Sequence, residues 1–317
     1  MSPVRPEDRL IERRSLKIGV IASAVMAAAG IGVHVISGSY AVLLDGLYSA
    51  VMVGSGLVAA RISRNVVRPP DRAYPYGYDG QEALYVLFRS LVLIGVLSCA
   101  AVSAFSTIVD YTNGTPVMAV RLGPVAFYSL AMVVICWGLA WRHQHDWVMA
   151  GRHSRILLTE AKAARVDGLI SGLTGLALLG TTLLQGSVLA VLIPIVDSVL
   201  VLVVSVAVLR EPLEGFLTAL GQAAGMSAES DLIRSTRLAL EDLLAGLSCW
   251  LLDLTVYEMG RTAFVVVYLN PNQPMDGAAI DVIRDRIQER CRDLLARPVR
   301  TEVILTAISP FSASSAS

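Results

Sequence analysis

Residues 188–210 read VLAVLIPIVDSVLVLVVSVAVLR, in which Asp197 is the one charged side chain before Arg210. A helix needs roughly 20 apolar residues to cross the hydrocarbon core of a bilayer, and this run is long enough. Working outward along the chain, further apolar runs of this kind lie at about 16–37, 40–63, 82–110, 124–142 and 156–184. Because backbone groups in lipid must bond internally, we predict six transmembrane helices.

The overall composition agrees with a membrane protein. Hydrophobic residues make up 55% of the 317 residues and charged residues 16%, against about 25% charged in a typical soluble domain. The formal net charge is zero, so the chain lacks the basic surplus expected of a nucleic-acid partner. The four cysteines form no CxxC pair, which predicts neither a disulfide framework nor a zinc knuckle.

Basic side chains alternate between the connections that join the predicted spans. The N-terminal segment and the second and fourth connections each carry several arginines, whereas the first and fifth carry no Lys or Arg, and the third carries only Arg121. Lys and Arg flanking a span stay on the cytoplasmic side. We therefore expect both termini to be cytoplasmic, in a bacterial inner membrane, with membrane lipid as a partner.

The pattern of apolar residues changes after Arg210. Two later segments have the three- and four-residue spacing of amphipathic helices, and three are rich in β-branched and aromatic residues. The expected elements are a helix at 228–246, strands at 250–257 and 262–269, a helix that Asp276 caps and a strand at 300–307. This α-β-β-α-β order predicts a small ferredoxin-like α+β domain.

The sequence therefore predicts four parts. A cytoplasmic segment covers residues 1–15, the membrane domain 16–210 and the cytoplasmic α+β domain 211–307, while a Ser- and Ala-rich tail at 308–317 is expected to be disordered. The α+β domain contains no histidine. Dimerisation, rather than metal binding, is thus its expected role.

Three motifs, in chain order, resemble those of the cation diffusion facilitator (cation efflux) family. They are GSYAVLLDGLYS at 38–49, YPYGYDGQE at 74–82 and TEAKAARVDG at 159–168, and Asp197 also matches. The resemblance implies a homodimer that exports a metal or other small cation, most often a divalent metal, by antiport with protons. No bound cofactor is expected.

The family's transport site takes two residues four apart on the second helix and two on the fifth, so that each pair shares one helix face. The resemblance places these positions at Tyr48, Met52, Ala163 and Asp167. Only Asp167 is an ordinary zinc ligand, because a protonated phenol binds poorly and a thioether suits Cu(I). We therefore expect an altered transport site.

Oxygen atoms nearby offer a different ligand set. Asp45 has Ser49 four residues on, and Asp167 has Ser171 four residues on. Together with Tyr48 and Met52 they form the candidate metal site, and their oxygens would suit Mg²⁺, Mn²⁺ or a monovalent ion. An acid inside a span marks a functional site or a specific partner.

A structural explanation for these acids stays open. Lys162, Arg165 or Arg89 could neutralise Asp167 in an ion pair, and Asp45 and Asp197 match family positions outside the ion shell.

The histidines have mainly structural interpretations. For His34, an interior hydrogen bond is expected. His143, His145 and Asp146, with His153 nearby, could bind zinc weakly or form a polar cluster at the membrane interface.

Asp71 and Tyr78 fall where some members of the family hold a second metal. A tyrosine replaces a histidine there, so we expect that site to be weak or absent.

Two functions remain open. One is a cation transporter with an altered ion site, and the other is a non-transporting relative that serves as a membrane scaffold or partner subunit. An enzyme is not expected, because the sequence offers no nucleophile–base pair and no Gly-rich phosphate loop.

Overall fold

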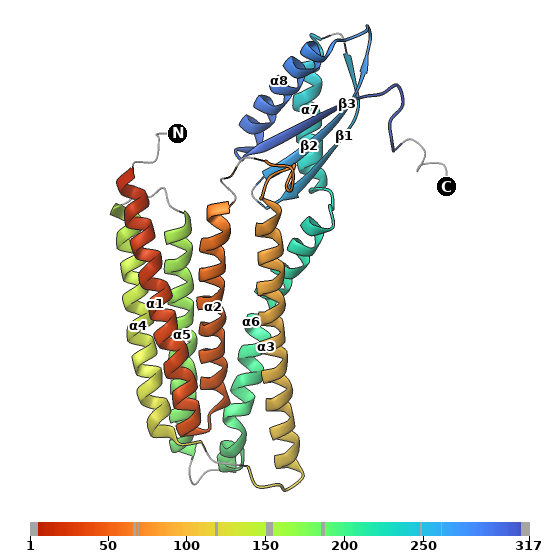
Figure 1. Cartoon of the computed structure of the whole chain (residues 1–317). Coiled ribbons are helices and arrows are strands. Elements are labelled where there is room, and N and C mark those ends of the chain that lie inside the picture. The colour runs from red at the N-terminus through yellow and green to blue at the C-terminus, as the bar shows by residue number, and fades with distance from the viewer. Residues whose placement is uncertain are drawn as a thin grey trace. The chain divides into compact units, whose positions relative to one another are not determined.

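The computed structural model describes residues 6–65, 68, 70–117, 120–149, 155–184, 188–247, 249–260 and 262–311. The chain forms two compact units (Figure 1). The first contains Met1–Val58 and Arg89–Glu214, and the second contains Ala59–Phe88 and Gly215–Ser317. The second unit is therefore built from two separate stretches of chain.

Six helices of the described chain are long and apolar enough to cross a membrane, which confirms the predicted number. Large apolar side chains such as Val35 and Phe127 are more than three-quarters exposed on them. Such a surface suits contact with lipid rather than water. The helices are α1 (Pro6–Ser37), α2 (Tyr40–Asn65), α3 (Gly80–Thr112), α4 (Leu122–Met149), α5 (Arg155–Gly180) and α6 (Val196–Ala223).

A two-residue turn joins α1 to α2. Gly38 has a φ of 75°, a conformation that only glycine adopts without cost, and its N–H bonds to His34 O at 2.8 Å. His34 Nδ1 donates to Ser39 O at 2.9 Å. The hydrogen bond expected of His34 is therefore confirmed.

Two glycines let α1 and α2 come into backbone contact. A Cβ atom on Gly30 would lie 2.6 Å from Gly46 Cα, and one on Gly46 would lie 3.0 Å from Gly30 Cα. Small residues at a crossing allow membrane helices to pack closely without a large apolar interface. The crossing lies at Gly46, the residue that follows Asp45 on α2.

The last span differs from the prediction at both ends. Residues 188–195 form a 3₁₀ segment, η2 (Val188–Ile195), with Pro194 inside it, and the α-helix begins only at Val196. Proline cannot donate the helical hydrogen bond, which favours this irregular start. α6 then continues past Arg210 and Pro212 to Ala223, so the boundary expected at 210 falls inside a helix.

The second unit has the predicted α-β-β-α-β order. Strands β1 and β2 are antiparallel, with Val256 opposite Val265, and β2 and β3 are parallel, with Val265 opposite Thr301. Asp276 caps α8 as expected, by accepting a hydrogen bond from Ala279 N. The elements are α7 (Ser230–Leu244), β1 (Cys249–Met259), β2 (Thr262–Pro271), α8 (Gly277–Leu295) and β3 (Val299–Leu305).

The core of this unit lies between the sheet and helices α7 and α8 (Figure 1). Ile283, Ile287 and Cys291 of α8 are buried there with Val267 of β2. They recur every four residues, within the three- and four-residue spacing that predicts this helix, whereas Leu294, three residues after Cys291, is 41% exposed. Leu294 lies in the last turn of the helix, beyond the buried stripe.

The segment that precedes α3 packs against β2 and the β1–β2 turn within the second unit. The Tyr76 ring meets Phe264 of β2 edge-on, with centroids 5.3 Å apart. A Cβ atom on Gly260 would lie 2.5 Å from Asp79 O. Only a glycine in the β1–β2 turn leaves room for this approach.

The end of the chain is more ordered than expected. Ser309 Oγ donates to Asp253 Oδ2 at 2.8 Å, and Phe311 packs edge-on against Tyr268. The disorder expected from 308 onward is therefore wrong for 308–311, because these side chains find partners on β1 and β2. Residues 312–317 lie outside the described chain.

Candidate cation site

A cavity of about 690 Å³ lies within the first unit, lined by side chains from α2 to α6. All four positions that the resemblance assigns to the transport site line it: Tyr48, Met52, Ala163 and Asp167. They come from α2 and α5, which bring both pairs to one space. The cavity therefore contains the region in which the sequence placed the ion.

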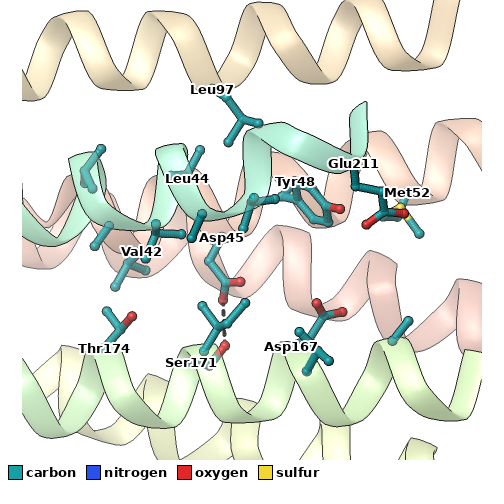
Figure 2. A pocket seen from close by; sticks show the side chains of 18 of the residues that line it. Val42, Leu44, Asp45, Tyr48, Met52, Leu97, Asp167, Ser171, Thr174 and Glu211 are labelled. Atoms are coloured by element: carbon teal, nitrogen blue, oxygen red, sulfur yellow. Dashed lines mark hydrogen bonds between the residues drawn. The ribbon is translucent and has the colours of Figure 1, made fainter. Parts of the chain in front are cut away.

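Polar side chains of α2 and α5 meet across this cavity. Asp45 and Tyr48 of α2, and Asp167 and Ser171 of α5, all line it, and Figure 2 shows Asp45 directed toward Ser171. Each pair is three or four residues apart, a spacing that keeps both side chains on one helix face. The structure thus brings four of the predicted site residues together, and Met52 lies one turn farther along.

Ser49 was expected in the same site, but it is buried on α2 outside the cavity lining. A residue that follows its neighbour in an α-helix is rotated by about 100°. Because Tyr48 faces the cavity, Ser49 points to a different side of the helix. The structure therefore does not support Ser49 as a ligand.

The carboxylate of Asp45 is held by two hydroxyl groups. Tyr128 OH of α4 donates to Oδ2 at 2.7 Å, and Ser171 Oγ lies 3.4 Å from the same atom. Tyr128 was not predicted as a site residue. It lies in an apolar segment in which no polar residues at helical intervals mark it as a site residue. Its role becomes visible only through the packing of α4 against α2 and α5.

Asp167 has no ion pair with Arg89, Lys162 or Arg165 in the part of the chain that the structure describes. Lys162 and Arg165 are exposed and do not line the cavity. The charged groups that act on Asp167 are themselves acidic, namely Asp45, Glu160 and Glu211. Contacts among the described residues thus do not supply the neutralising partner that the structural explanation requires.

Arg89 brings a positive charge from α3 into the cavity lining. Its Nη2 donates to Met52 Sδ at 2.9 Å, and its charge acts on Glu160 and Tyr48. Arg210, the other arginine of the lining, pairs with Glu214 at 2.7 Å where both side chains are largely exposed. The sequence suggests Arg89 only as a partner for Asp167, and no ion pair joins the two among the described residues.

The donor atoms of the cavity are mostly hard oxygens. Carboxylates of Asp45 and Asp167 accompany the hydroxyls of Tyr128, Ser171 and Thr174, whereas the Met52 thioether is already hydrogen-bonded. Oxygen donors suit Mg²⁺, Mn²⁺ and alkali ions better than thiophilic metals. Among the described residues, no three His, Cys, Asp or Glu side chains gather closely enough to hold a metal by themselves.

Asp197 has a structural position. Its carboxylate accepts hydrogen bonds from Ser39 Oγ at 2.5 Å and from Tyr40 N at 2.7 Å. A carboxylate at a helix N-terminus satisfies free N–H groups and complements the helix dipole. Asp197 of α6 thus caps α2 and does not line the cavity.

The histidines near the end of α4 do not converge on one point. His143 is buried and its Nδ1 hydrogen-bonds with Ser15 Oγ of α1 at 2.8 Å. The exposed His145 lies 3.7 Å from Asp146 instead. The contacts favour a polar cluster over a zinc site, and His153 lies outside the described residues.

Asp71 and Tyr78 contact each other within the second unit. Tyr78 OH donates to Asp71 Oδ2 at 2.5 Å. This hydrogen bond lowers the pKa of Asp71 below its ordinary value and raises the pKa of Tyr78 above its own. The Tyr78 hydroxyl is therefore hydrogen-bonded to the carboxylate that a second metal would need as a ligand.

The sequence between residues 16 and 221 matches the family model of the cation efflux transmembrane domain. The chain belongs to the cation efflux family. The matched region of this cation efflux protein includes the apolar part of every membrane helix and ends within α6. No curated protein matches the chain. The protein is thus an integral membrane protein of a family that transports cations, with a C-terminal α+β domain.

Proposed function

We propose that this cation efflux protein exports a hard cation in exchange for protons, with Asp45 and Asp167 as the groups that carry both. One observation supports the proposal above all: carboxylates from α2 and α5 line one cavity inside the membrane spans. An acid in this setting is costly to keep, and it is typically retained where an ion or proton uses it.

The proposed coupling follows from competition for the same oxygens. A carboxylate binds a metal only after losing its proton, so cation binding releases protons and protonation releases the cation. The cavity would open alternately to the two sides of the membrane, as α2 and α5 move relative to their neighbours.

The proposed cargo differs from that of an ordinary zinc exporter. Met52 and Ala163 supply no hard ligand at half of the family's site, whereas oxygen atoms of Asp45, Asp167 and Ser171 remain. Mg²⁺, Mn²⁺ or a monovalent ion would fit these donors.

The proposed setting is a homodimer in a bacterial inner membrane. The distribution of Lys and Arg favours cytoplasmic termini, which would place the C-terminal domain in the cytoplasm and give export its direction. The three-stranded sheet and its two helices would supply the dimer contact.

Flux measured in proteoliposomes tests this proposal. The full chain is reconstituted with a pH-sensitive dye inside, and gradients of Mg²⁺, Mn²⁺, Fe²⁺, Zn²⁺, Na⁺ and Cu⁺ are applied in turn. Wild type should move protons against at least one cation, and Asp167→Ala should abolish the signal. Arg165→Gln, an exposed neighbour outside the cavity, should keep it. A wild type that is inert to every cation would overturn the proposal.

A non-transporting membrane scaffold or partner subunit is the second candidate. The hydrogen bond from Tyr128 to Asp45 favours it, because that bond satisfies the carboxylate without an ion. This function predicts no flux in wild type and no change in assembly with Asp167→Asn. Cation flux that depends on Asp167 would exclude it.

A further inference from the structure

Arg89 of α3 reaches Met52, one of the four positions at which the family's ligands stand. Its Nη2 donates to Met52 Sδ at 2.9 Å, and both side chains are partly buried. Ala163 of α5, which also lines the cavity, has no ligand atom. A guanidinium keeps its charge at any physiological pH and cannot accept a hydrogen bond or bind a metal. This part of the cavity therefore contains a fixed positive charge instead of a metal ligand.

Among the described residues, no ion pair neutralises the charge of Arg89. No carboxylate stands within ion-pair distance of it in the described parts of the chain, although its charge acts on Glu160 and on Tyr48. Lys162 and Arg165, by contrast, lie outside the lining, and Arg210 is paired with Glu214. Arg89 thus stands out as the arginine whose charge remains available to act on a cation in the cavity.

We propose that Arg89 is a specificity-determining residue that lowers the preference of the transport site for doubly charged over singly charged cations. This inference rests on the proposed function, since it concerns the cargo of the same cavity. Coulomb repulsion is proportional to the charge of the cargo, so Arg89 opposes a divalent ion twice as strongly as a monovalent ion at the same place. The partly buried setting leaves this repulsion less screened than at an exposed surface.

A second consequence concerns Glu160, which stands three residues before Ala163 on α5 and lines the same cavity. Its carboxylate, when ionised, offsets the charge of Arg89. Neutralising both groups should therefore return the electrostatic potential of the cavity toward that of wild type. Arg89→Gln alone should make the potential more negative, and Glu160→Gln alone should make it more positive.

The experiment measures cation affinity on the purified full chain by the shift in thermal unfolding with rising Mn²⁺ or Na⁺. Arg89→Gln should raise the apparent Mn²⁺ affinity by about tenfold and the Na⁺ affinity by about threefold, because the factor for a doubled charge is squared. Glu160→Gln should lower the Mn²⁺ affinity. The double variant should lie near wild type, and Arg165→Gln, outside the lining, should match wild type throughout.

An Arg89→Gln protein whose Mn²⁺ affinity equals that of wild type and Arg165→Gln would overturn the inference. Should Arg89→Gln fail to fold, Glu160→Gln decides alone, and an unchanged Mn²⁺ affinity there counts against it. Flux separates the two proposals. A wild type that neither binds nor moves any cation refutes both, whereas a wild type that transports through Asp167 without these affinity changes refutes only the role of Arg89.

Discussion

Tyr128 on α4 donates a hydrogen bond from its hydroxyl to Oδ2 of Asp45 on α2 over 2.7 Å. This bond connects two helices through the carboxylate that is proposed to bind the cargo. A cation that uses Oδ2 must share it with the phenol or displace it. The same bond thus contributes to the stability of the bundle and competes with the ion.

Replacing Tyr128 by phenylalanine should make the protein less stable but more responsive to its cargo. Leaving a buried group without its hydrogen-bond partner costs about 1–3 kcal/mol, so the unfolding temperature should fall in cation-free buffer. A saturating cation should then recover more stability than in wild type. Tyr40→Phe serves as the control, because it removes a hydroxyl that makes no hydrogen bond among the described contacts. Equal unfolding temperatures for the two variants would contradict this role of Tyr128.

Removing the Asp197 carboxylate should destabilise the start of α2. Asp197→Ala leaves Ser39 Oγ and Tyr40 N without their acceptor, and we expect a loss of about 3 kcal/mol in the free energy of unfolding. Asp110→Asn, an exposed acid on α3, should change little. Denaturant titration in detergent measures both, and a Asp197→Ala variant as stable as Asp110→Asn would argue against the cap.

A methyl group on Gly30 should separate α1 from α2. The added Cβ would lie 2.6 Å from Gly46 Cα, whereas a Cβ on Gly32 of the same helix meets nothing within 4 Å. Gly30→Ala should therefore lower the yield of folded protein and its unfolding temperature, and Gly32→Ala should leave both intact. Size-exclusion profiles and thermal unfolding of the pair provide the comparison. If both variants behave alike, the close helix crossing is not important for stability.

The contact between Asp71 and Tyr78 should hold over a wide range of pH. Because the pKa of Asp71 is lowered, its stabilising effect is present above about pH 3.9 and is lost as pH falls through the lowered pKa. Because the pKa of Tyr78 is raised, its effect is present below about pH 10 and is lost as pH rises through the raised pKa. Tyrosine titration by NMR should show that Tyr78 ionises at a higher pH in wild type than in Asp71→Asn. Identical titrations would rule out the hydrogen bond.

Most of the fold could be predicted because its signals are local. Apolar runs as long as 188–210 specify membrane spans whatever surrounds them, and the spacing of Ile283, Ile287 and Cys291 alone indicates a buried helix face. The bounds of a helix depend on more than the local sequence. The charge at Arg210 suggested that the last span ends there, but α6 continues to Ala223 because a helix can cross from lipid into water without interruption.

The site was only partly predictable because its remaining parts depend on contacts between distant segments. Asp45 and Asp167 were visible as acids inside spans. Tyr128 became a site residue only through the packing of α4, and Arg89 reaches Met52 rather than Asp167. No spacing rule within one helix encodes such contacts.

The two-part construction of the second unit changes how its C-terminal domain can be exchanged. Because Ala59–Phe88 belongs to that unit, the chain passes between the units at three points rather than through one tether. A chimera joined at Gly215 alone would place a foreign sheet against the native Tyr76 and Asp79, whose approach requires Gly260. An exchange of this domain with another member of the family, in either direction, therefore requires that Ala59–Phe88 be moved together with it.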